Sequence, residues 1–236
     1  MRPFTCTRVS DVQGAVRAAA VHGDSGPPTE APAQFIAGGT TMLDLMKLGT
    51  MQPVILVDIN DPEAEHGRIA AGPDGLRLGA LVRMSEAADH PMIRQDYQPS
   101  RRRCSRRPAP SSATWRRWAA MSSSGPVASM SASRAGTAAT SASPAPAAPR
   151  SRGVNRKHAV LGVGERCVAE YPGDLAPALV AFGTVVETVG PLRPRGLQLE
   201  ELHRGPEDPH VATVLAPGEI ITGFLVPAAP WTRRSL

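Results

Sequence analysis

The chain has 236 residues, enough to bury a core that is divided between two subdomains. Its hydrophobic content of 42% is ordinary for a water-soluble protein, although only 4% of its residues are aromatic. No run of about 18 apolar residues is present, and the sequence MRPFTCTRVSDVQ lacks the basic-then-apolar order of a signal peptide. These features predict neither membrane insertion nor a cleaved leader.

The positive charge is confined to one segment of the chain. Residues 101–152 hold ten arginines and no acidic residue, whereas the whole chain carries +5, so the remainder carries about −5. The globular part therefore gives no electrostatic sign of nucleic-acid binding. Cys6, Cys104 and Cys167 lie far apart without CxxC spacing, which argues against a disulfide framework or a metal site.

Hydrophobic patterning before the basic segment predicts alternating strands and helices. We expect a helix capped by Ser10, a short helix capped by Thr40 or Thr41, and a helix capped by Ser85 that stops before Pro91. The run PVILVDI predicts a strand buried on both sides, and Pro73-Asp74-Gly75 predicts a hairpin turn. The other expected strands are residues 4–9 and 34–37.

The chain after the basic segment continues the mixture of helices and strands. Residues 173–182 predict a helix, and residues 184–189 and 219–226 predict strands. The order has no regular strand–helix–strand rhythm. It therefore predicts an α+β fold rather than a doubly wound sheet.

The stretch QFIAGGTTMLDLMK joins a strand to a helix through two glycines and two threonines. Glycines let the backbone approach an anion closely, and such a turn can aim several N–H groups at it. The helix N-terminus and two hydroxyl groups would add to the attraction. This chemistry suits a diphosphate, although a Gly-Gly pair between strand and helix is more often only a turn.

The sequence resembles the flavin subunit of the molybdenum hydroxylases, the family of xanthine dehydrogenase, carbon monoxide dehydrogenase and aldehyde oxidoreductase. The resemblance rests on FIAGGTTMLDLMK, PVILVDIN and DGLRLGALVRMSEAADHP, followed in order by GVNRKHAVLG, CVAEYPGDLAPALVAF and LAPGEIITGFLVP. It covers residues 1–98 and 153–236. It implies an α+β FAD-binding domain of the molybdopterin dehydrogenase (PCMH-like) type in two lobes, 1–98 and 153–236, interrupted by residues 99–152.

The resemblance also implies a set of cofactor-binding residues. The AGGT-like turn would bind the FAD diphosphate, an aspartate would contact the cofactor, and an apolar residue would lie beside the flavin. Asp174 could equally be a helix cap, and Ile221 could equally belong to a strand core. The candidate FAD-binding residues are Ile36, Ala37, Gly38, Gly39, Thr40, Thr41, Met42, Leu43, Asp174 and Ile221.

The function implied by the resemblance is electron transfer within a larger oxidoreductase. The partners would be a large subunit with the molybdenum cofactor and a small subunit with a [2Fe–2S] cluster, and FAD would pass electrons to an acceptor. No catalytic acid or base need reside on this chain. We expect a cytoplasmic location, or a periplasmic one if a partner subunit carries the signal.

Residues 99–152 lack any hydrophobic periodicity and contain no Leu, Ile, Phe, Asp, Glu, Asn, Gln or Lys. The family has a second flavin motif here, similar to T-x-G-G-N, which this sequence lacks. Read one base out of frame, Thr114 to Ser124 permits N-M-A-T-M-G-G-N-V-L-Q, which contains that motif. Further along, residues 139–148 permit a cysteine-bearing loop of the kind that holds a [4Fe–4S] cluster in relatives.

We therefore interpret residues 99–152 as a frameshifted, irregular segment without cluster cysteines. We also interpret the chain as lacking the small C-terminal domain that the family carries. These losses predict weak or absent FAD binding. Two alternatives stay open: a non-catalytic remnant or assembly scaffold without flavin, and, less favoured, a nucleic-acid-binding arm that stacks Trp115 and Trp118 on bases.

Overall fold

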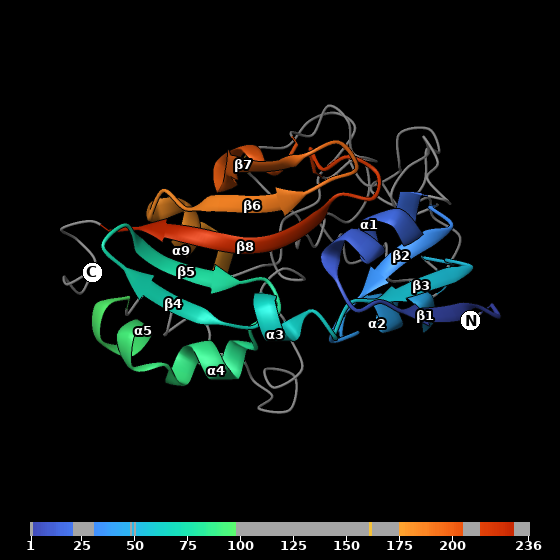
Figure 1. Cartoon of the computed structure of the whole chain (residues 1–236), viewed down its shortest axis with the longest axis horizontal. Helices are drawn as coiled ribbons and strands as arrows, with labels where there is room; N and C mark the ends of the chain where they lie inside the picture. Colours follow the sequence, from blue (N-terminus) through green and yellow to red (C-terminus); the bar gives the residue numbers. More distant parts are fainter. Residues whose placement is uncertain are drawn as a thin grey trace.

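The computed structural model contains two β-sheets with helices packed around them (Figure 1). One sheet is parallel with the order β1-β3-β2, and the other is antiparallel with the order β4-β5-β8-β6-β7. This mixture confirms the α+β prediction. The structure describes residues 2–20, 31–47, 49, 51–97, 161, 175–204 and 213–228. Segment 99–152 and Asp174 lie outside the described residues.

The parallel sheet consists of β1 (Thr5–Arg8), β2 (Ala33–Ile36) and β3 (Ile55–Asp58). Helix α1 (Val12–Ala20) packs its buried Ala15 and Val16 against the core that contains Val57. The Oδ1 atom of Asp11 accepts a hydrogen bond from the amide of Gly14 at 2.6 Å, so the helix is capped by Asp11. The prediction that Ser10 caps this helix is therefore wrong.

The antiparallel sheet consists of β4 (Ile69–Gly72), β5 (Gly75–Gly79), β6 (Val185–Val189), β7 (Pro194–Gln198) and β8 (Ile220–Pro227). The sequence did not predict β7, because Pro194 and Gly196 are unfavourable in strands. Its place at the sheet edge explains why both are tolerated, since Pro194 is the first residue of the strand.

One face of the antiparallel sheet carries the larger core. Helices α4 (Met84–Asp89), α5 (Pro91–Asp96) and α9 (Leu175–Ala181), with the 3-10 turn η1 (Leu199–Glu201), contribute buried side chains to it. The sheet contributes Phe224, which is fully buried. The prediction that Ser85 caps α4 is wrong, because the helix begins at Met84 and its N-cap is Arg83. The helix ends before Pro91 as expected, and α5 begins at that proline, a favourable first position in a helix.

Strand β8 joins the two cores. Ile220 packs in the smaller core with α1 and β3, whereas Ile221 and Phe224 pack in the larger one. The antiparallel sheet combines β4 and β5, which precede residue 98, with β6, β7 and β8, which follow residue 153. The predicted lobes, 1–98 and 153–236, are thus stretches of sequence that share one sheet.

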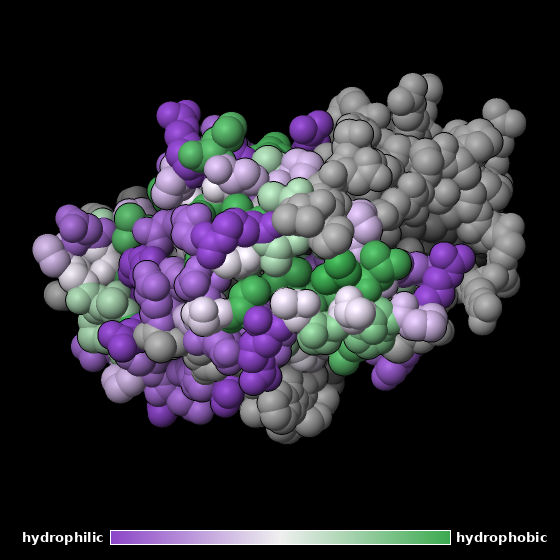
Figure 2. All heavy atoms as spheres, turned by 45° about the vertical axis from the view of Figure 1, so that its right-hand side comes forward, coloured by the Kyte–Doolittle hydropathy of each residue, from purple (hydrophilic) through white to green (hydrophobic). Residues whose placement is uncertain are grey.

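The described surface is largely polar, with apolar side chains gathered in places. Figure 2 turns the parallel-sheet side of Figure 1 forward and shows a group of hydrophobic side chains beside a broad hydrophilic area. Phe4, Leu43 and Val54 of the parallel-sheet region are exposed large hydrophobic residues. Among the described helices, none is long and apolar enough to cross a membrane.

Candidate functional site

The glycine turn lies at the carboxyl edge of the parallel sheet. Strand β2 ends at Ile36, and helix α2 (Met42–Lys47) begins five residues after Ala37. Gly39 has a φ of +71°, a left-handed conformation that side chains other than hydrogen disfavour. A Cβ atom at Gly39 would also lie 3.0 Å from Cδ1 of Leu43. The turn therefore requires glycine at position 39.

The amides of this turn have no hydrogen-bond acceptor among the described residues. The first backbone bond after the turn is donated by the amide of Leu43 to the carbonyl oxygen of Gly39, at 2.9 Å. The preceding amides, of residues 38–42, donate to no described backbone or side-chain group. All five residues are partly exposed. Consecutive N–H groups of this kind form a concave site that attracts anions.

Asn60 holds the start of the turn. Its Nδ2 atom donates to the carbonyl oxygen of Ala37 at 3.1 Å and to Oδ1 of Asp58 at 2.7 Å. Asp58 is the last residue of β3, so Asn60 links the carboxyl ends of two neighbouring strands. Sequence reasoning missed this residue, although an asparagine directly after the apolar run VILVDI was a signal that could have found it.

Asp58 is ionised and fixed in place. Its partial burial disfavours the charge, but the backbone and side-chain N–H groups of Asn60 and the guanidinium of Arg8 more than offset this and lower the pKa of Asp58. The Nε atom of Arg8 lies 3.1 Å from Oδ2 of Asp58 and 3.8 Å from Oδ1 of Asp61. The carboxylate therefore stays a reliable acceptor for Asn60 at neutral pH.

A small crevice lies beside the turn, between the two cores. The Ile59 amide donates to the carbonyl oxygen of Ile36 at 3.0 Å, while the Ile59 side chain lines the crevice, so the two features adjoin. Helix α1, helix α3 (Glu63–His66) and the start of β8 form the walls. The lining residues are Val12, Ala15, Ile59, Pro62, His66, Leu81, Ile220, Ile221 and Thr222.

His66 is the notable polar group in this apolar crevice. The residue is 7% exposed, and its Nδ1 atom has no hydrogen-bond partner among the described residues. Thr222 also lines the crevice, but its Oγ1 atom already donates to the carbonyl oxygen of Glu187 at 3.2 Å. A buried nitrogen without a partner loses its hydration without compensation, so a ligand that reached it would gain a favourable contact.

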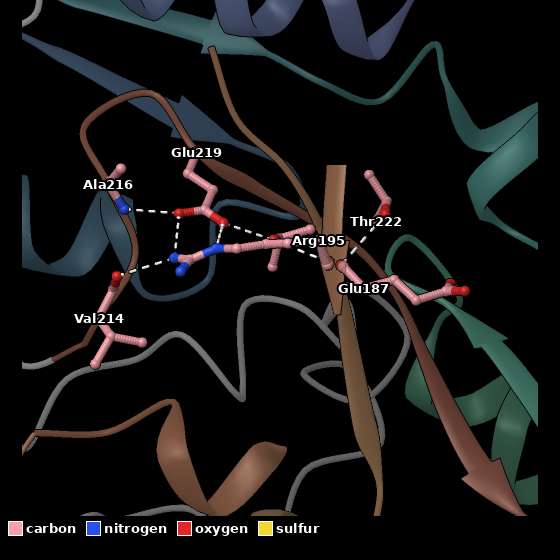
Figure 3. A network of polar contacts seen from close by, with 7 residues as sticks. Glu187, Arg195, Val214, Ala216, Glu219 and Thr222 are labelled. Carbon is pink, nitrogen blue, oxygen red and sulfur yellow. Dashed lines mark hydrogen bonds and ion pairs between the residues drawn. The ribbon is translucent and has the colours of Figure 1, made fainter. Parts of the chain in front are cut away.

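The start of β8 is held by a polar network around Glu219 (Figure 3). Its carboxylate accepts hydrogen bonds from Nε of Arg195 at 2.6 Å and from Nη2 of Arg195 at 2.7 Å. It also accepts hydrogen bonds from the Ala216 amide at 2.8 Å and from Oγ1 of Thr188 at 2.5 Å. Burial alone would raise the pKa of Glu219, but these donors together lower it, so a nearly inaccessible carboxylate stays charged.

The candidate residues fall into two adjoining places. Ile36 to Leu43 form the turn and its flanks, and Ile221 lines the crevice, where it is 5% exposed. Asp174 lies outside the described residues. Sequence reasoning missed Asn60, His66 and the Arg195–Glu219 pair. Asn60 and Glu219 lie within PVILVDIN and LAPGEIITGFLVP, but they act through Ala37 and Arg195, which lie elsewhere in the chain.

The sequence pattern of the FAD-binding domain in molybdopterin dehydrogenase matches residues 2–229. The chain belongs to this family. A similar protein, the aldehyde oxidoreductase FAD-binding subunit PaoB of Escherichia coli strain K12, is 34% identical over 233 residues, which cover 96% of this chain and 69% of PaoB. This relative is a subunit of an oxidoreductase.

Solved structures of family members share the fold. Carbon monoxide dehydrogenase from Oligotropha carboxidovorans aligns with a TM-score of 0.67 and 17% identity, covering 98% of this chain and 62% of that chain. Quinoline 2-oxidoreductase from Pseudomonas putida 86 aligns with a TM-score of 0.65 and 14% identity, covering 97% and 60%. The chain thus spans about three-fifths of the length of these solved chains.

Proposed function

We propose that the chain is the FAD-binding part of an electron-transfer subunit in a molybdenum-containing hydroxylase. One observation carries this proposal: a glycine turn whose amides have no acceptor among the described residues lies near a crevice lined by His66, whose buried Nδ1 atom has no described partner. The turn suits the diphosphate of FAD, and the mostly apolar side chains of the small crevice would contact one part of its ring system. The donors of the turn therefore fit the diphosphate of FAD.

Each group at this site would bind or orient the cofactor. Amides of residues 38–42 would donate to the diphosphate, and Asn60 would keep the turn in place through Ala37. Ile220 and Ile221 would exclude water from the crevice, and His66 would hydrogen-bond a polar ring atom. Bound FAD would supply the redox chemistry, while the protein contributes binding and orientation.

The name of the relative PaoB supports a proposal for the partners. PaoB is named as the FAD-binding subunit of an aldehyde oxidoreductase, so we propose a complex with a molybdenum-cofactor subunit and a [2Fe–2S] subunit. Electrons would then reach FAD from iron–sulfur clusters. Among the described residues, no group of three or more potential ligands could hold a metal. We propose that the complex works in the cytoplasm, or in the periplasm if a partner carries the signal.

We expect this chain to bind FAD weakly. The turn and the crevice are intact, but the written sequence has no T-x-G-G-N motif to supply a second set of donors. Each loss of about 1.4 kcal/mol weakens binding tenfold. Recoding residues 99–152 in the alternative reading frame should therefore tighten FAD binding by at least about tenfold, the equivalent of one such loss.

The test is a titration of FAD into the full chain, followed by quenching of flavin fluorescence. Gly39→Ala should weaken binding because it strains the turn and crowds Leu43. Gly49→Ala is the matched control, since Gly49 has a φ of +73° at the other end of α2, and a Cβ atom there would lie 3.8 Å from Nε2 of Gln52, an ordinary contact distance.

Equal FAD affinities of the two variants would contradict the proposed place of the diphosphate. No saturable binding by the unchanged chain would contradict the proposed function itself. Co-purification with a molybdenum subunit in that case would favour the alternative of an assembly scaffold without flavin.

A further inference from the structure

The pairing of β6 with β8 contains a bulge beside the crevice. Glu187 pairs with Gly223, but Thr188 pairs with Ile221, so Thr222 is an extra residue on β8. Its Oγ1 atom donates to the carbonyl oxygen of Glu187, which fills part of the gap in the ladder. Bulges of this kind redirect side chains and are frequent next to binding sites.

The bulge decides where two isoleucines point. In a regular strand Ile221 would share a face with Gly223 and Leu225, because side chains alternate with a period of two. Instead it packs in the larger core with Phe224, and Ile220 packs against the smaller core. Both side chains consequently line the crevice between the two cores.

The Glu219 network fixes the chain immediately before these isoleucines. Arg195 reaches Glu219 from β7 across β6, and the same Arg195 donates from Nη2 to the carbonyl oxygen of Val214 at 3.1 Å. The adjoining Gly218 has a φ of +75°, and a Cβ atom there would lie 3.6 Å from Cβ of Ala19 in α1. The turn before β8 is therefore tied to the antiparallel sheet and lies against α1.

We propose that the Arg195–Glu219 pair is a positioning device for the FAD pocket. It holds the start of β8 so that Ile220 and Ile221 close the crevice in which the cofactor ring binds. This inference rests on the proposed function. Arg195 and Glu219 do not themselves reach the crevice lining, so they act through the two isoleucines.

A second ion pair in the same sheet provides the control. The Nε atom of Arg77 on β5 lies 2.7 Å from Oε2 of Glu187 on β6, across Gly223 of β8. Both side chains are more than a third exposed, and neither lines the crevice. Removing this pair leaves the turn before β8 untouched.

The experiment compares Arg195→Met, Arg195→Lys and Arg77→Met in the full chain. FAD affinity is measured by titration, and hydrogen exchange of the peptide spanning residues 216–224 is measured without FAD. Circular dichroism and thermal unfolding show whether each variant is folded. If Arg195→Met does not fold, Arg195→Lys carries the test, because lysine keeps the charge but cannot form the two parallel hydrogen bonds.

We expect Arg195→Met to bind FAD about tenfold more weakly, the equivalent of about 1.4 kcal/mol, and Arg195→Lys to lie between it and the unchanged chain. Both should exchange faster in residues 216–224, whereas Arg77→Met should match the unchanged chain in both measurements.

Unchanged FAD affinity in folded Arg195 variants would overturn the inference while leaving the proposed function intact. Faster hydrogen exchange in residues 216–224 without weaker FAD binding would show that the ion pair is purely structural, and it would also overturn the inference. A lack of FAD binding by the unchanged chain would remove the proposed function and this inference together.

Discussion

The turn after β2 and the turn before β8 stand beside the same crevice but differ in how their polar groups are satisfied. Amides 38–42 have no acceptor among the described residues, whereas the Glu219 carboxylate accepts four hydrogen bonds from three residues. Unsatisfied but accessible donors can be kept for a ligand at little cost. A buried carboxylate must be satisfied by the protein itself. The first turn is therefore suited to binding, and the second to holding shape.

The largest effect on stability should come from removing the ion pair of Glu219 in the turn before β8. Arg195→Met leaves the Glu219 carboxylate, 3% exposed, without its counter-charge. Because the Arg195 side chain is itself 41% exposed, the loss should stay below the roughly 3–5 kcal/mol of a fully buried pair. Arg77→Met removes a partly exposed pair and should cost less than about 1 kcal/mol. Urea denaturation at pH 7 measures both. Equal losses would show that burial does not distinguish the two pairs.

The carboxylates of Glu219 and Asp58 should govern the response to acid. The pKa values of Glu219 and Asp58 lie below their ordinary values of 4.5 and 3.8, so the unfolded chain takes up protons before the folded one does. Their contribution is complete above about pH 4.5 and is lost as the pH falls through the lowered folded-state values.

In Arg195→Met the hydrogen bonds and charge of Arg195 no longer lower the pKa of Glu219, and burial still raises it. The folded-state pKa of Glu219 then moves toward or above its unfolded-state value, so protonation of Glu219 no longer favours unfolding. The free energy of unfolding should therefore decline less between pH 7 and pH 3 in this variant than in the unchanged chain, which urea denaturation at several pH values measures. An equal decline in both chains would mean that Arg195 does not set the ionisation of Glu219.

A moderate effect on stability and on FAD affinity should follow from removing the hydrogen bond that holds the glycine turn, residues 38–42. Asn60→Ala removes the hydrogen bond to the carbonyl oxygen of Ala37 and should lower the free energy of unfolding by about 1 kcal/mol. Asn60→Ala should weaken FAD binding more than Gln52→Ala does, since the Gln52 side chain donates to the Gly49 carbonyl oxygen, beyond the far end of α2. Titration of both variants measures this difference. Equal affinities would show that Asn60 does not position the turn.

The smallest change in stability is expected at His66, where the free energy of unfolding should stay the same or rise while FAD affinity falls. His66→Met replaces a partnerless buried nitrogen by an apolar side chain, which should be neutral or stabilise by up to about 1 kcal/mol. FAD affinity should fall nonetheless. His90→Met is the control, because the Nδ1 atom of His90 also lacks a partner but lies outside the crevice. A similar fall in both variants would exclude a specific contact with His66.

Local patterns explain which parts of the fold could be predicted from the sequence. The run VILVDI and the Gly-Gly turn predicted β3 and the β2–α2 connection, because burial and left-handed backbone leave signs within a few residues. Strand β7 was missed, since its pairing with β6 outweighs the poor strand propensity of Pro194 and Gly196.

The site was only partly predictable for the same reason. The glycine turn carries its own signal, but Arg195 and Glu219 are 24 positions apart and meet only through the sheet. His66 reaches the crevice through α3, a four-residue helix that has no periodicity to detect. Long-range pairing determines these contacts, and no single stretch of sequence encodes it.

The central claim is that the turn amides hold the FAD diphosphate, and hydrogen exchange of peptides spanning residues 36–43 with and without FAD tests it most directly. Saturating FAD should slow exchange of the amides of residues 38–42, and inorganic pyrophosphate should slow the same amides to a smaller extent. FAD binding that leaves these amides unchanged, while other parts of the chain become protected, would contradict the account.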